Sequence, residues 1–278
     1  MSKLYKHIHG ITLYRKFRYR KGYGVHSPFI YSFITKVVEE KHSFYVFDEI
    51  EKFRKKMIAD NGLLSDLTLK ETQHRNYGAL LFRIVNFFRC SCVIQFGGST
   101  GIMSLYLTAA LHGHGCCYVF EKRKGVSCMV KNFLKDHSKN NLQIIETEYA
   151  NAQDILSYGA VSADLIFINK RSLEFSEAEK IFSSCLSLAG KKTILIIDHI
   201  NVDKEMKDLW QKIKNHPKSQ ATLDLYALGI VFFDNNLPKK HYITYFNYGK
   251  KQNIHKNRRR RFNFISWRKK SFKNKHSH

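Results

Sequence analysis

The sequence predicts an α/β fold built on a doubly wound, mostly parallel β-sheet that ends in an antiparallel hairpin. Between residues 92 and 215, short apolar segments alternate with amphipathic ones, the pattern of a parallel sheet with helices on both faces. Two further apolar segments, 221–226 and 230–233, are separated by only a short turn, so they are expected to pair as a hairpin. With 44% hydrophobic residues in 278, the chain can build a sizeable core, which excludes global disorder.

The first 75 residues are expected to form a basic arm followed by a helical extension. The arm, about 24 residues long, is rich in aromatic and basic side chains and is expected to pack on or near the body, with a transit peptide as the alternative. Pro28 suits the first turn of a helix that presents Phe33 and Val37 on one face. Two more helices are predicted over 44–59 and 77–88, with a turn and a polar stretch (63–74) between them.

Residues 76–249 are expected to form the sheet domain, and residues 250–278 a tail. Five apolar segments predict the parallel strands: 92–96, 116–120, 142–147, 163–168 and 193–197. Four amphipathic segments predict helices: one that begins near residue 102, one over 126–135, one that ends at 188 and one over 203–214. Residues 241–248 are predicted to be a further extended segment.

The positive charge of the chain is concentrated at its two ends. There are 47 Lys and Arg against 23 Asp and Glu, yet residues 1–38 carry eight basic residues and no acid, and residues 250–278 carry twelve and no acid. The nearly balanced middle indicates an ordinary globular body with basic ends. The tail 250–278 is predicted to be disordered and suited to an anionic membrane surface or RNA, with a solvated, solubilising segment as the alternative.

The sequence contains little evidence for a membrane-spanning segment or a metal site. No apolar run reaches 18 residues and the start has no apolar signal-peptide core, so the expected location is cytoplasmic, with peripheral contact at the inner membrane face through the tail. The six cysteines form no CxxC pair. Reduced thiols are therefore expected, and no zinc site.

The strongest chemical signal is the glycine-rich turn after the first predicted strand. Gly97 and Gly101 let the backbone approach a ligand closely, and the following helix start offers free amides. Glu121 comes twenty residues after Gly101, at the end of the second strand, where a carboxylate can accept hydrogen bonds from two ribose hydroxyls. Together they predict a nucleotide-cofactor site, against the alternative of a tight turn without a ligand.

The turn and the terminal hairpin together resemble the class I S-adenosylmethionine-dependent methyltransferases. Their Rossmann-like sheet places the last strand antiparallel beside the fifth, and residues 93–107 (VIQFGGSTGIMSLYL) look like their first motif. Residues 24–29 (GVHSPF), 77–81 (YGALL) and 224–233 (DLYALGIVFF) are similar to an O-methyltransferase-like subgroup common in Bacteroidetes bacteria. The resemblance covers about residues 20–248.

The resemblance implies S-adenosylmethionine as cofactor, held at the tips of the strands. The residues that it places at the cofactor are Gln95, Gly97, Ser99, Gly101, Glu121 and Glu148. Gln95 stands where the family has an acid, so the charge that balances the cofactor's ammonium group is missing. Related metal-dependent enzymes hold magnesium with carboxylates at the fourth and fifth strand tips. Here Asn169 and His199 leave only Asp198 as a carboxylate, so no metal site is expected.

The preferred function is methyl transfer to an oxygen of an unknown acceptor without a metal ion. Asp198, His199 and Asn169 are the candidate catalytic residues, with Asp198 or His199 as the base. The alternative is a catalytically degenerate relative that acts as a binding module through its basic termini. The residues that depart from the family pattern, Gln95, Asn169 and His199, favour this alternative, whereas Gly97 and Glu121 favour the enzyme. A dinucleotide or nucleotide-sugar enzyme is disfavoured, because it would need the last two strands to be parallel.

Overall fold

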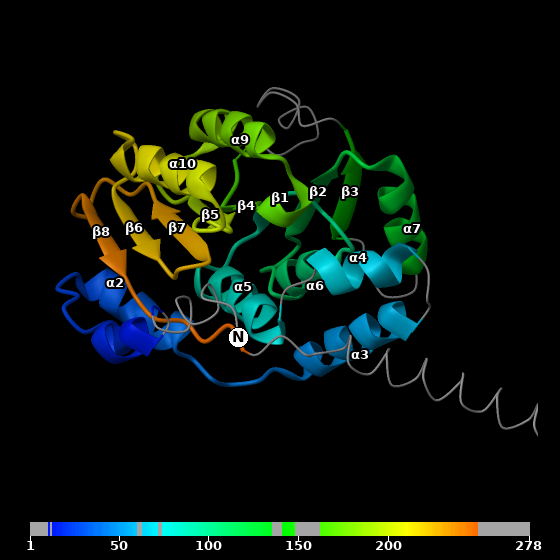
Figure 1. The fold of residues 1–278 in the computed structure, drawn as a ribbon, viewed down its shortest axis with the longest axis horizontal. Coiled ribbons are helices and arrows are strands. Elements are labelled where there is room, and N and C mark those ends of the chain that lie inside the picture. The colour runs from blue at the N-terminus through cyan, green and yellow to red at the C-terminus, as the bar shows by residue number, and fades with distance from the viewer. Residues whose placement is uncertain are drawn as a thin grey trace, which may run out of the picture. The chain divides into compact units, whose positions relative to one another are not determined.

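The computed structural model describes residues 11, 13–59, 63–71, 74–134, 141–147 and 162–249 (Figure 1). The described residues up to Asn247 belong to one compact unit. The predicted tail 250–278, with its binding to a membrane or RNA, lies outside the described residues, as do Glu148 and the turn at Asn61–Gly62. In the part of the chain that is described, no helix is long and apolar enough to cross a membrane.

The centre of the fold is an eight-stranded sheet with the order β3-β2-β1-β4-β5-β7-β6-β8. Its strands are β1 (Cys92–Phe96), β2 (Cys116–Glu121), β3 (Leu142–Glu146), β4 (Leu165–Ile168), β5 (Ile194–Asp198), β6 (Ala221–Asp224), β7 (Leu228–Phe232) and β8 (Lys240–Ile243). Strands β1 to β5 are parallel, β7 is antiparallel to both β5 and β6, and β8 is parallel to β6. The predicted doubly wound sheet with its antiparallel hairpin is confirmed, and every strand except β7 ends at the same edge.

Helices cover both faces of this sheet: α5 and α6 lie on one face, and α9 and α10 on the other (Figure 1). The helices are α2 (Pro28–Phe33), α3 (Tyr45–Ala59), α4 (Leu63–Glu71), α5 (Arg75–Phe87), α6 (Ile102–Ala109), α7 (Lys124–Leu134), α9 (Phe175–Leu188) and α10 (Lys204–Asn215). Short helical turns add η1 (Arg20–Gly22), η2 (Ile34–Val38) and η3 (Lys170–Ser172). Apolar residues that alternate along the strands, such as Ile166 and Ile168, form one core with the inner faces of α9 and α10.

The sequence reasoning missed helix α4, inside the polar stretch 63–74. Two of its polar side chains, Ser65 and Thr68, are buried and are satisfied locally. The Thr68 hydroxyl donates to the Leu64 carbonyl at 2.6 Å, and the Ser65 hydroxyl donates to the Ile58 carbonyl at 2.8 Å. A residue that is polar in the sequence can therefore occupy the buried side of a helix.

The N-terminal segment packs on the body through aromatic rings and one ion pair. The rings of Phe29 and Phe33 in α2 lie 5.4 and 5.5 Å from that of Phe232 in β7. Arg15 Nη1 lies 2.8 Å from Asp224 Oδ1. These contacts anchor the described part of the basic arm, from residue 13 onward, to the end of the sheet that carries the hairpin. The three-part domain division remains a prediction.

The cysteines lead to a prediction about thiol reactivity. All six are free, and burial raises the pKa of Cys90 and Cys117 to about 12 and that of Cys92 to about 11, whereas Cys128 is exposed. Because the thiolate is the reactive form, Cys128 should react first with a thiol-specific chromogenic disulfide at neutral pH, and the buried thiols only after unfolding. Cys128→Ser should remove the fast phase; a fast phase that survives this change contradicts the assignment.

Candidate functional site at the strand tips

The glycine-rich turn joins the end of β1 to the start of α6. Gly97 and Gly101 have φ angles of +81° and +76°, in the left-handed region that glycine adopts without strain. Ser99 lies between them at φ +52°, which is uncommon for a residue with a side chain. Gly98 is required by packing, because an added Cβ would lie 2.7 Å from Val119 Cγ1 in β2. The turn therefore has a sharp and tightly packed backbone.

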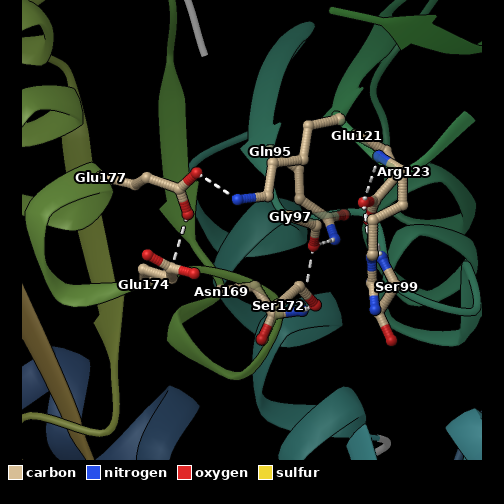
Figure 2. A network of polar contacts seen from close by, with 10 residues as sticks. Gln95, Gly97, Ser99, Glu121, Arg123, Asn169, Ser172, Glu174 and Glu177 are labelled. Carbon is tan, nitrogen blue, oxygen red and sulfur yellow. Dashed lines mark hydrogen bonds and ion pairs between the residues drawn. The ribbon is translucent and has the colours of Figure 1, made fainter. Parts of the chain in front are cut away.

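Two buried amide side chains hold this turn in place (Figure 2). Gln95 Nε2 donates to the Gly97 carbonyl at 3.0 Å, and Gln95 Oε1 accepts from the Ser104 hydroxyl at 2.8 Å. Asn169, which follows β4, donates from Nδ2 to the same Gly97 carbonyl at 2.9 Å and to Ser172 Oγ at 3.2 Å. A carboxylate could replace neither amide in these bonds, because it has no N–H to donate.

Glu121 lies at the end of β2 and its side chain is 1% exposed. Its Oε2 accepts the Ser99 backbone N–H at 2.8 Å, which ties it directly to the glycine turn. Arg123 binds both oxygens: its Nε lies 2.8 Å from Oε1, its backbone N–H donates to Oε1 at 3.1 Å, and its Nη2 donates to Oε2 at 3.2 Å. The acid is thus a buried, paired group that contacts the glycine turn (Figure 2).

Asp198 and His199 pair with each other at the end of β5, the strand beside β4. Asp198 is fully buried; its Oδ1 accepts the His199 backbone N–H at 2.9 Å, and its Oδ2 lies 2.6 Å from His199 Nδ1. The His199 side chain is 18% exposed and its φ is +60°, so it stands at the surface of the sheet edge in a left-handed conformation. Backbone of this kind is often kept at functional sites.

The network extends beyond the predicted residues to the start of α9. Lys122 pairs with Glu177, whose other oxygen accepts the Glu174 backbone N–H at 2.7 Å and so caps the helix (Figure 2). Sequence reasoning missed Arg123, Lys122 and Glu177. The signal for Arg123 was available, because a cation two residues after an acid can fold back on it at the end of a strand.

Known proteins agree with this architecture at the level of structure. No family model matches the chain, and no curated sequence matches it significantly. Several solved structures match the chain. An O-methyltransferase from Bacillus cereus in complex with SAH has a TM-score of 0.51 at 14% identity, over 72% of this chain and 96% of that chain. The O-methyltransferase TomG from Streptomyces achromogenes, in complex with SAM, has a TM-score of 0.52 at 14% identity, over 73% and 94%. The SAH-bound methyltransferase PaMTH1 from Podospora anserina has a TM-score of 0.53 at 10% identity, over 76% and 97%. The chain has the class I methyltransferase fold.

Within this methyltransferase fold, five predicted site residues come together at the tips of three adjacent strands: Gln95, Gly97, Ser99, Glu121 and Asn169. Gly101 begins α6 in the same turn. Because β7 is antiparallel to β5 and β6, the topology also lacks the parallel last strands that a dinucleotide or nucleotide-sugar enzyme would need.

Proposed function

We propose that the chain is an S-adenosylmethionine-dependent methyltransferase that methylates an oxygen acceptor without a metal ion. The observation that carries the proposal is the hydrogen bond from the Ser99 N–H to Glu121. This bond joins the glycine turn after β1 to a buried carboxylate at the end of β2 in a methyltransferase fold. The comparisons with SAM- and SAH-bound enzymes support the same cofactor class.

The residues at the strand tips fit such a cofactor. A carboxylate has about four lone-pair positions, so Glu121 can accept ribose hydroxyls in addition to the Ser99 N–H, provided that Arg123 gives up part of its contact. The left-handed turn from Gly97 to Gly101 leaves its backbone close to any ligand above it. When bound, S-adenosylmethionine supplies an activated methyl group on a sulfonium centre.

His199 is the proposed base, and Asp198 its orienting partner. Asp198 holds His199 through the backbone N–H and lies 2.6 Å from Nδ1 without forming a hydrogen bond to it, and Nε2 is the ring nitrogen that is proposed to accept a proton from an acceptor hydroxyl. Asn169 is proposed to act by fixing the turn through the Gly97 carbonyl. A metal-free reaction is proposed because Asp198 is the one carboxylate among Asn169, Asp198 and His199 at this pair of strand tips.

Calorimetric titration of the purified full chain with S-adenosylmethionine, S-adenosylhomocysteine and NAD tests the proposal. Micromolar binding of the first two, and none of NAD, is expected, and would justify a screen of hydroxyl acceptors. A folded sample that binds neither sulfur compound overturns the enzyme and leaves the alternative, a degenerate methyltransferase fold that binds partners through basic termini at an inner membrane face or on RNA.

Arg123 supplies a prediction about affinity. Its guanidinium competes with ribose hydroxyls for Glu121, so Arg123→Ala should tighten S-adenosylhomocysteine binding by about three- to tenfold. This gain corresponds to the free energy of one charge-assisted hydrogen bond, reduced by the packing that is lost with the arginine side chain. Arg89→Ala, an exposed arginine on another loop, is the control for the lost charge. Weaker binding in Arg123→Ala would show that the arginine supports the site.

A further inference from the structure

A second feature of the chain is a cavity of about 730 Å³ lined by the N-terminal segment, one side of α5 and the segment after β8. Arg75, Ala79 and Arg83 repeat every four residues along this side of α5, and residues 245–247 also line the cavity. None of the described residues that line the cavity belongs to the predicted cofactor site. The size matches sites for small molecules, which are commonly 300–1,000 Å³.

The lining of this cavity is strongly basic. Six lysines and arginines face two carboxylates: Lys16, Arg20, Lys21, Lys41, Arg75 and Arg83 against Glu39 and Glu40. Both carboxylates are engaged by the chain itself. Glu39 accepts the Lys21 backbone N–H, and Glu40 Oε1 accepts the Lys41 and His42 backbone N–H groups at 2.6 and 2.8 Å. With Arg75 paired to Asp48, five lysines and arginines remain against these two carboxylates, so the cavity keeps a surplus of positive charge.

Arg83 is the decisive residue, because it is 9% exposed and forms no ion pair within 4 Å with an acid of the described residues, Glu40 acting on it only from farther away. Its Nε donates to the Val37 carbonyl at 2.9 Å, and within the described ranges its two terminal nitrogens have no hydrogen-bond partner. Burial lowers the pKa of its guanidinium, with the charge of Glu40 acting in the opposite direction. By contrast, Arg75 is paired with Asp48 at 2.6 Å. The two terminal nitrogens of Arg83 are not among the enclosed polar atoms that lack a partner, so they are open to the cavity, and they match two oxygens of one phosphate.

We propose that this cavity binds a phosphorylated small molecule, with Arg83 holding the phosphate oxygens and Lys16 and Arg20 adding charge at the rim. A single carboxylate would neutralise only part of the surplus charge, which favours a multiply charged phosphate group. Phe47, Tyr245 and Phe246 in the same walls offer apolar surface to the remainder of the ligand. The site is independent of methyl transfer, since it shares no lining residue with the strand tips.

Calorimetric titration of the full chain with sodium pyrophosphate, at constant ionic strength and with citrate as a carboxylate comparison, tests this site. Pyrophosphate should bind, citrate more weakly, and Arg83→Gln should weaken pyrophosphate binding at least tenfold. Arg89→Gln, the loss of an exposed charge just beyond the same helix, should leave the affinity unchanged. No pyrophosphate binding, equal binding in Arg83→Gln, or citrate binding as tight as that of pyrophosphate overturns the proposal. Equal binding in Arg83→Gln would place the pyrophosphate on basic residues outside this cavity.

A second variant keeps the test decisive if Arg83→Gln does not fold. Lys16 and Arg20 are exposed, so Lys16→Gln/Arg20→Gln should fold with an unchanged circular dichroism spectrum. Its pyrophosphate affinity should fall at least threefold, with binding of S-adenosylhomocysteine unaffected. An unchanged pyrophosphate affinity in this double variant contradicts the site.

Discussion

Glu121→Ala is expected to weaken S-adenosylhomocysteine binding about a hundredfold, because two hydrogen bonds from ribose hydroxyls to a carboxylate, worth about 1.5 kcal/mol each, are lost together. The carboxylate is 1% exposed and lies against the glycine turn, so no water-exposed group can take its place. Titration calorimetry of the variant, next to the unaltered chain, measures the effect.

Two further variants separate this role from general effects. Glu121→Gln keeps one acceptor oxygen and should lose about tenfold in affinity. Glu49→Ala removes an exposed glutamate from α3 and should change nothing. The melting temperature of each variant must also be recorded, since Arg123 and the Ser99 N–H lose their partner in Glu121→Ala. Unchanged affinity in a folded Glu121→Ala variant would remove Glu121 from the cofactor site.

Gly78→Ala should lower the free energy of unfolding by about 2 kcal/mol, and the melting temperature by about 5 °C. An added Cβ at this position in α5 would lie within 2.8 Å of three ring atoms of Tyr106. That ring is fully buried, and its hydroxyl donates to Glu51 at 3.0 Å, so it cannot move aside without breaking this bond. The gain in helix propensity from glycine to alanine, about 1 kcal/mol, is smaller than the cost of such overpacking.

Gly125→Ala is the matched control, because Gly125 is also in a helix and no atom lies within 4 Å of an added Cβ. The same substitution there should leave stability unchanged or raise it slightly. Thermal unfolding followed by circular dichroism compares the two. If Gly78→Ala is as stable as Gly125→Ala, the contact between α5 and α6 is looser than described.

Most of the fold could be predicted from the alternation of short apolar segments with amphipathic ones along the chain. The segment predicted as a strand over 92–96 matches β1, and the hairpin was predicted because two apolar segments were separated by a turn too short for a parallel connection. Helix α4 was not predicted, because Ser65 and Thr68 are polar residues that are buried in the structure. Their burial depends on hydrogen bonds, which hydrophobic periodicity does not reveal. The place of β8 at the sheet edge depends on long-range pairing with β6.

Only those parts of the candidate site that depend on local sequence could be predicted. The turn from Gly97 to Gly101 and the acid at Glu121 follow from position after predicted strands. The bond from Asn169 to the Gly97 carbonyl could not be predicted, because it joins residues 72 positions apart across two strands. Gln95, two residues before Gly97, donates to the same carbonyl. What looked like lost acids in the sequence are amides that donate to this carbonyl.

The most direct test of the proposed function is a crystal structure of the chain with S-adenosylhomocysteine. The account predicts ribose hydroxyls within hydrogen-bonding distance of Glu121, with Arg123 displaced from at least one of its oxygens. The amino-acid part of the ligand should lie over the turn from Gly97 to Gly101, and the sulfur should face His199. Density for the ligand elsewhere, with the Glu121–Arg123 pair intact, would contradict it.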